Sequence, residues 1–298
     1  MTLCESRRRF FTSSIAAAAA ASTSLRMPSP AVAADEETST GSPLRLGLMT
    51  YNLARDWDLD TIIANCTEAK FEHAELRTTH AHGVEVTLSR AERAAVRRRF
   101  EDVGIALSLA SGFAYHWPDP QQLRENIEGT KEYTLLAEDI GAIGIRVFPN
   151  ALLADKGIPE QQTIEQIAGA VTQVATFAAD HGVEIRLANH GRGTNRVTVI
   201  KRILDAADCE HIYVNWNCDR TDVEDPGFEA NFDSVKDRIR NLHLHELWNP
   251  AYPYRKLFAL LRQNGYQGYC DAEVQASAEP IRFMQYYRGL FLALQDAL

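Results

Sequence analysis

Short apolar runs alternate with longer amphipathic segments from residue 46 to the end of the chain. The short runs are typical of buried strands and predict eight of them, at residues 46–51, 72–77, 105–110, 143–148, 183–188, 211–216, 240–245 and 268–274. Helical periodicity fills the intervals, for example at residues 88–102, 120–140, 159–181 and 252–264. Strands that alternate with helices form parallel sheets, and eight such units predict a single-domain α/β fold, the (β/α)8 TIM barrel, over residues 45–298. A doubly wound open sheet is the alternative, but TYNLARDW (50–57), after the first strand, lacks the Gly-rich turn of that fold.

Alternate positions along the predicted strands divide into an apolar set and a polar set. Side chains alternate along a strand, so in a barrel one set faces the helices and the other faces the interior or the mouth. We expect the apolar set, such as Ile145, Val147 and Leu244, to pack under the helices. The polar set is expected inside: Glu75, Arg77, Ser108, Arg146, Glu184, Arg186, Asn215, Asn217, His243, His245, Asp271 and Glu273. Aliphatic residues normally fill a barrel interior, so these polar groups must be paired, hydrated or used.

Histidines gather at the carboxyl ends of the predicted strands, where barrel enzymes hold their active sites. Six of the nine lie there, namely His80, His82, His116, His190, His243 and His245, whereas His73, His181 and His211 lie at the opposite ends and receive no chemical role. In RNLHLHELW (240–248), His243 and His245 are expected to be ligands or substrate contacts, or core histidines satisfied by hydrogen bonds. Glu273 is the leading functional residue, because an inward carboxylate is costly without a cation or a substrate.

The inward arginines have two interpretations. Arg77, Arg146 and Arg186 can neutralise Glu75 and Glu184 in an interior ion-pair layer. At the mouth, Arg77 and Arg146 can instead bind a carboxylate or phosphate through the guanidinium fork. The loop HGRGTNR (190–196) can wrap an anion with backbone amides and Arg192.

The first 34 residues have the pattern of an export signal. SRRRFFTSS (6–14) precedes an Ala-rich apolar run and the sequence AVAA (31–34). The arginines and the weakly hydrophobic run resemble a twin-arginine signal, with a general secretory signal or a disordered cytoplasmic start as alternatives. The apolar run is too short for a membrane span. We therefore expect an exported, periplasmic or extracytoplasmic protein, with a flexible linker at residues 35–44.

The charge of the chain limits the class of partner, and the spacing of its cysteines indicates the state of the thiols. Cleavage near residue 33 would remove four arginines and Glu5, which takes the formal net charge from −9 to −12. An acidic chain argues against a nucleic-acid partner. The remaining cysteines, Cys66, Cys209, Cys218 and Cys270, show no C-x-x-C spacing and predict free, mostly buried thiols.

Four motifs at the strand ends resemble the xylose isomerase-like TIM barrels, a family of sugar epimerases, hydroxypyruvate isomerase-like enzymes and endonuclease IV relatives. They are ANHG (188–191), VNWNCDR (214–220), LHLHE (242–246) and GYCDAE (268–273). The resemblance implies a divalent metal held by Glu, Asp, His and Glu, with carboxylates that move a proton beside a sugar carbonyl. Position by position, the His corresponds to His243 and the last Glu to Glu273. The other two ligand positions hold Ala188 and Asn217.

Because of these two replacements, the sequence does not decide whether a metal binds or which one. Alanine offers no donor and asparagine only a neutral oxygen, so binding of Mg²⁺ or Mn²⁺ should weaken. A Zn²⁺ site of His243, Glu273 and Asn217, joined by His190 or His245, is the softer alternative. The resemblance implies that Glu273 is the base that removes the proton, with Glu75 or Glu246 as the second carboxylate of the pair.

The leading hypothesis is a sugar isomerase or epimerase that acts on a small carbonyl sugar or sugar acid. In it, Glu273, His243 and Glu75 carry the chemistry. Substrate contacts come from Arg77, His82, Arg146, His190, Arg192, Asn217 and His245. The alternative is a non-catalytic sugar-binding barrel with a degenerate metal site. An abasic-site endonuclease is disfavoured, because that chemistry needs a metal cluster and a basic groove. The sequence does not give the oligomeric state.

Overall fold

Eight parallel strands close into a barrel at the centre of this computed structural model, which describes residues 42–297. Around the barrel the order is β1-β10-β9-β8-β6-β4-β3-β2. The strands are β1 (Arg45–Met49), β2 (His73–Arg77), β3 (Ala106–Ala114), β4 (Gly144–Phe148), β6 (Glu184–Ala188), β8 (Ile212–Trp216), β9 (Ile239–Leu244) and β10 (Tyr269–Ala272). This confirms the predicted single-domain (β/α)8 fold. The predicted export signal and most of the predicted linker lie outside the described residues.

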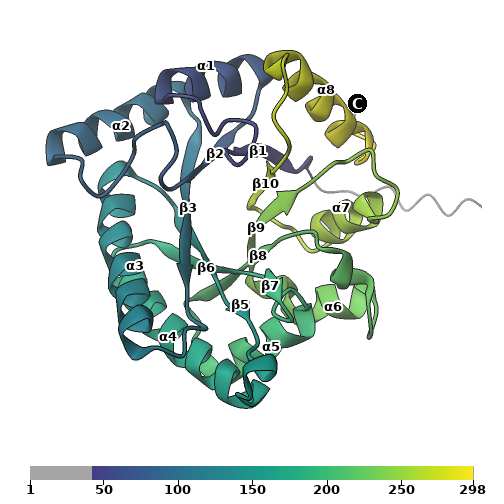
Figure 1. The fold of residues 1–298 in the computed structure, drawn as a ribbon. Coiled ribbons are helices and arrows are strands. Elements are labelled where there is room, and N and C mark those ends of the chain that lie inside the picture. Colours follow the sequence, from purple (N-terminus) through teal and green to yellow (C-terminus); the bar gives the residue numbers. More distant parts are fainter. Residues whose placement is uncertain (1–41, 298) are drawn as a thin grey trace, which may run out of the picture. The chain divides into compact units, whose positions relative to one another are not determined.

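Eight helices surround the barrel, and each lies outside the strands in Figure 1. They are α1 (Leu59–Ala69), α2 (Arg90–Val103), α3 (Pro120–Ile140), α4 (Glu160–Asp180), α5 (Val197–Ala207), α6 (Phe228–Val235), α7 (Tyr254–Gln263) and α8 (Pro280–Ala293). Within residues 42–297, no helix is long and apolar enough to cross a membrane.

Local sequence signals set where several helices begin and end. Ser89 and Glu92 form a capping box at the start of α2, and Asp119 with Pro120 starts α3. Gly104 and Gly141 end the same two helices in the left-handed conformation that glycine adopts without steric cost. Short elements complete the loops: the two-stranded sheet of β5 (Asn150–Ala151) and β7 (Gly191–Arg192), and the 3-10 helices η1 (Ala154–Lys156), η2 (Arg220–Val223) and η3 (Lys236–Arg238).

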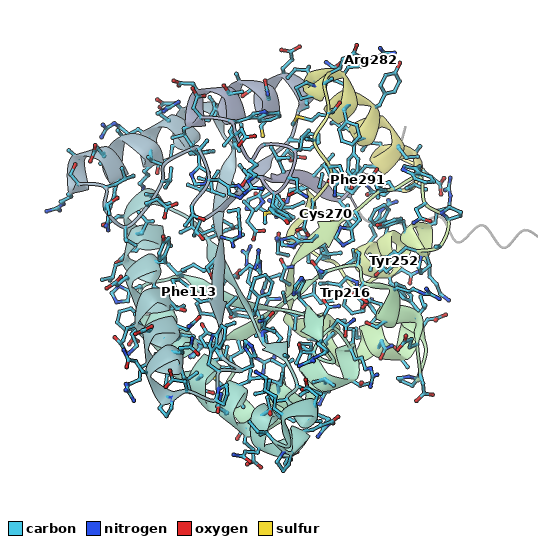
Figure 2. All side chains as sticks on the ribbon, viewed as in Figure 1. Phe113, Trp216, Tyr252, Cys270, Arg282 and Phe291 are labelled. Carbon is cyan, nitrogen blue, oxygen red and sulfur yellow. The ribbon has the colours of Figure 1, made fainter. Side chains whose placement is uncertain are left out.

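The main apolar core lies between the strands and the helices. Leu76, Val147 and Leu244 are fully buried there, as the strand alternation predicts. Figure 2 shows Phe291 on the barrel side of α8 and Arg282 near the outer edge of the same helix. Cys66, Cys218 and Cys270 are buried, Cys209 is partly exposed, and all four carry free thiols as expected.

The polar set faces the barrel interior and forms a connected chain of side chains, here called the polar column. It runs through Glu75, Asn241, Asp271, His73, Ser108, Arg186 and Glu184. Asn241 Nδ2 lies 3.4 Å from Glu75 and 2.9 Å from Asp271, whose other oxygen is 2.7 Å from His73 Nδ1. At the far end, Arg186 donates two hydrogen bonds to Glu184. The predicted ion-pair layer therefore exists for Arg186 and Glu184.

Two glycines make room for this column. A Cβ atom on Gly47 would overlap Asp271 Oδ1 and would lie 2.8 Å from His73 Cβ. A Cβ atom on Gly144 would lie 2.6 Å from Arg186 Nε. The bulky polar groups thus fit inside the barrel because the strands facing them carry no side chain at these points.

Candidate active site

A cavity of about 230 Å³ opens at the carboxyl ends of the strands. Its lining consists of Tyr51, Arg77, Arg146, Phe148, His190, Asn217, His243 and Glu273. The structure thus brings together six residues that the sequence analysis selected, from six different strands or the loops that follow them. Tyr51 and Phe148 were missed, although the same alternation would have found them, since Tyr51 continues the series Gly47 and Met49, and Phe148 follows Arg146.

His243 lies at the floor of this cavity between two carboxylates. Its Nε2 is 2.5 Å from Glu75 Oε2, and its Nδ1 is 3.3 Å from Glu273 Oε2 and 3.2 Å from Asn217 Oδ1. Burial alone would lower the pKa of His243, but the negative charges of Glu75 and Glu273 outweigh it and raise this pKa to about 10. At neutral pH the imidazole therefore carries both protons and donates from both nitrogens.

Glu273 is the one carboxylate that lines the cavity among residues 42–297. Its side chain is 20% exposed, whereas that of Glu75 is fully buried. Burial acts to raise the pKa of Glu273, but the hydrogen bond and charge of His243 prevail and lower it to about 2. Glu273 is therefore ionised at neutral pH and can accept a proton from a molecule in the cavity.

Two guanidinium groups face Glu273 across the cavity. Arg146 is buried, lies with its Cζ 3.9 Å above the centre of the Phe148 ring and donates from Nη1 to the Ser111 carbonyl. Burial lowers the pKa of Arg146 to about 10, so the group remains a cation at neutral pH. Arg77 is half-buried and donates to the carbonyl and hydroxyl oxygens of Thr78.

His190 supplies a second titratable imidazole. Its ring centre lies 4.7 Å from that of Phe148. Burial, with Arg146 second, lowers the pKa of His190 below its usual value. The ring is therefore neutral at pH 7 and can exchange a proton with a bound molecule.

Four residues of the predicted site lie outside the cavity lining. Glu75 is buried behind His243, and His245 contacts the carbonyl oxygens of Asn217 and Glu273 at 2.9 and 3.3 Å. His82 bridges the Arg77 carbonyl and the Val84 amide within its own loop. Arg192 is exposed and pairs with Asp155 at 2.7 Å. Side-chain alternation along a strand predicts whether a side chain faces the barrel interior, but not how deep it lies along the barrel. For this reason the sequence predicted Glu75 and His245 in the cavity, although neither lines it.

A larger cavity, of about 670 Å³, lies at the opposite end of the barrel near Arg45, Arg186 and Arg240. Its arginines have partners, since Arg186 pairs with Glu184 at 2.7 Å and Arg45 stacks on Tyr269. TIM-barrel chemistry occurs at the carboxyl end. The smaller cavity, which contains an ionised carboxylate beside unpaired cations, is therefore the candidate active site.

Residues 63–287 match the family model for the xylose isomerase-like TIM barrel. The chain belongs to this family. A comparison with curated protein sequences finds no match.

Solved structures support the same fold for this member of the xylose isomerase-like TIM barrels. The 3-keto-D-glucoside 4-epimerase YcjR from E. coli aligns with a TM-score of 0.69 at 15% identity, over 85% of this chain and 99% of the other. An L-ribulose 3-epimerase aligns with a TM-score of 0.70 at 16% identity, over 85% and 95%. A D-allulose 3-epimerase from Methylomonas sp. aligns with a TM-score of 0.68 at 14% identity, over 85% and 98%. Identities this low establish the common fold alone.

The donor atoms at the strand ends do not fit the metal that the family resemblance implies. Ala188 is buried and offers no donor, and Asn217 contributes a neutral oxygen beside His243 Nδ1. Glu273 is then the single anionic donor, and Arg77 and Arg146 line the same cavity as cations. A hard dication binds where several carboxylates converge, so this set disfavours it.

A second set of possible ligands lies deeper in the barrel. Glu75, His243 and Asp271 have ligand atoms within 4.8 Å of one another, the one such group of His, Cys, Asp or Glu that the described part of the chain holds. The Asn241 amide nitrogen already bridges its two carboxylates. Of the predicted zinc set, His243 Nδ1 lies 3.3 Å from Glu273 Oε2 and 3.2 Å from Asn217 Oδ1, while both ring nitrogens of His245 contact backbone carbonyls.

Proposed function

We propose that the chain is a sugar isomerase or epimerase that moves a proton next to the carbonyl of a small sugar or sugar acid. The observation that supports it most is the ionised, partly exposed Glu273 in a cavity lined otherwise by Phe148 and by side chains that donate hydrogen bonds. The epimerases among the structures of the same fold are consistent with this reaction class.

The proton-transfer step assigns a role to each cavity group. Glu273 accepts the proton from the carbon next to the carbonyl, and His243 holds the carboxylate in place. Negative charge then develops on the carbonyl oxygen, where a preorganised donor of the lining such as the Asn217 amide stabilises it. For isomerisation, Glu273 can return the proton to the neighbouring carbon on the same face, while the hydroxyl proton of the deprotonated carbon passes to the former carbonyl oxygen. For inversion of a centre, a second group must deliver a proton to the opposite face, and His190 can do so after it has taken up a proton from solvent.

Glu75 does not line the cavity and is a positioning residue in this proposal. Its carboxylate accepts from His243 Nε2 and fixes the ring so that Nδ1 points at Glu273. This replaces the direct proton-transfer role that the sequence analysis gave to Glu75.

Exchange with deuterated water tests the reaction without knowledge of the product, because a proton taken by Glu273 equilibrates with solvent. Neutral sugars and sugar acids are incubated with the enzyme in D₂O, and deuterium next to the carbonyl is measured by NMR. We expect Glu273→Gln to slow exchange by roughly 10²- to 10⁴-fold, the usual contribution of a general base. Glu128→Gln, on the exposed face of α3, is the control and should exchange normally. Full exchange in Glu273→Gln would exclude this residue as the base.

A non-catalytic sugar-binding barrel is the second candidate function. Its support is that Ala188 and Asn217 occupy two family ligand positions. Tight binding of a sugar by calorimetry in the presence of chelator, with no deuterium exchange in the wild-type protein, would favour it over the enzyme.

A further inference from the structure

Arg146 is a buried cation with no carboxylate partner. It is 3% exposed, and within residues 42–297 no carboxylate oxygen lies within 4.0 Å of it. Its Nε is buried and makes no hydrogen bond inside this described region. A buried charge is costly unless it is paired, so such a group favours the binding of an anion.

Arg77 adds a second cation to the same cavity. Its Nη1 contacts only the neutral oxygens of Thr78, and none of the described carboxylates lies within 4.0 Å of the guanidinium. Two arginines are buried among the described residues, Arg146 and Arg186, and Arg186 pairs with Glu184 at 2.7 Å. The lack of a carboxylate within 4.0 Å therefore distinguishes Arg146, and Arg77 brings a second such guanidinium group to the same cavity.

The charge of the cavity exceeds what its own carboxylate neutralises. Arg77, Arg146 and the protonated His243 are three cations, and the carboxylates beside them are Glu273 in the lining and Glu75 behind His243. Three positive charges against two negative charges leave one positive charge in excess. A ligand that carries one negative charge would satisfy them better than a neutral sugar of the same size.

We propose that the cavity binds a small sugar acid, with its carboxylate held between the guanidinium groups of Arg146 and Arg77. The inference rests on the proposed function and deepens it, since it names the substrate class of the same site. A carboxylate matches the planar fork of a guanidinium group. The volume of about 230 Å³ lies below the roughly 300–1,000 Å³ of pockets that hold drug-sized ligands, which favours a single small sugar unit.

Calorimetry with matched acid and neutral sugars tests this. The probes are a panel of hexuronates and hexonates, each paired with its neutral hexose, added to protein treated with chelator. Charge-assisted hydrogen bonds make each acid that fits bind roughly ten- to a hundredfold tighter than its neutral partner. Arg146→Gln and Arg77→Gln should each remove most of this preference. Arg97→Gln, on the exposed face of α2, is the control and should keep it.

Several outcomes would overturn the proposal. They are equal or tighter binding of the neutral sugars, no binding by any acid, binding that requires added Mn²⁺ or Zn²⁺, or stronger binding of a hexose phosphate than of the acids. If Arg146→Gln does not fold, Arg77→Gln alone tests the preference for acids, because Arg77 is only half-buried. The deuterium-exchange assay separates the two proposals. Exchange of a neutral sugar only would support the proposed enzymatic activity and contradict the sugar acid as its substrate. Binding of the acid without exchange would support the sugar acid as the ligand and contradict the enzymatic activity.

Discussion

At the residue scale, the state of His243 depends on its neighbours more than on its burial. Burial would leave it neutral, yet the carboxylates of Glu75 and Glu273 keep it doubly protonated, with a pKa of about 10. One consequence is that a metal ion at Nδ1 would have to displace a proton from the ring at neutral pH. Another is that the stability of the fold depends on the proton that His243 holds.

The sign of that dependence follows from the raised pKa. A group whose folded-state pKa lies above its unfolded value, here about 6.5, contributes stability that is complete below pH 6.5 and is lost as the pH rises to about 10. We expect the free energy of unfolding to fall between pH 7 and 10 by an amount on the order of 1–3 kcal/mol.

Urea unfolding at several pH values measures this effect. In Glu75→Gln the carboxylate that raises the pKa of His243 is absent, so the fall between pH 7 and 10 should become smaller. His211→Gln, at a partly exposed position, is the control and should keep the slope of the wild-type protein. An unchanged slope in Glu75→Gln would mean that His243 is not the group that titrates.

Individual residues also show which features of the site can be predicted from the sequence. Alternation along the strands correctly selects Arg77, Arg146, Asn217, His243 and Glu273 for the cavity, because direction is a local property of a strand. Depth depends on register between strands that are distant in sequence, so the burial of Glu75 behind His243 is not visible in the sequence. The role of His73 is missed for a related reason, since its partners Asp271 and Ser108 are distant along the chain.

At the scale of elements, β1 has little tolerance for a larger side chain. Gly47 lies opposite Asp271 on β10 and His73 on β2, and a Cβ atom there would collide with both. We expect Gly47→Ala to lower the free energy of unfolding by about 1–3 kcal/mol, the usual cost of overpacking a core.

Gly169→Ala is the matched comparison. Gly169 lies inside α4, and a methyl group added to it would meet nothing within 4 Å, so alanine should raise the free energy of unfolding by about 0.5–1 kcal/mol through helix propensity. Urea unfolding of both variants measures the two changes in the free energy of unfolding, which should have opposite signs. If both variants changed this free energy equally, β1 would be able to adapt to a larger side chain.

The extents of the elements follow the sequence closely where capping residues are present. The predicted helix at residues 120–140 is the observed α3, because Asp119 and Gly141 mark its ends. In contrast, β3 continues to Ala114, beyond the predicted end at residue 110. The segment Ser111–Ala114 is held by the Ser111 contacts with Arg146, which lies far along the chain, so its strand conformation depends on a distant partner.

At the scale of the whole molecule, the proposed route out of the cytoplasm is read from the sequence alone. We expect a reporter fused to residues 1–40 to be exported by the twin-arginine route. Replacement of Arg7, Arg8 and Arg9 by lysine should abolish export, whereas Arg26→Lys, in the same segment, should not. Protease protection of the reporter in whole cells measures this, and export that survives the triple replacement would indicate the general secretory route.

The polar column also has a consequence for the whole barrel. Asn241 lies between Glu75 and Asp271, and a primary amide neither gives up nor accepts a proton near neutral pH. The column therefore does not relay protons past Asn241. A proton that Glu273 takes up can therefore reach His243 and Glu75 but not travel further along the column, and the mouth of the cavity is the route to solvent that remains.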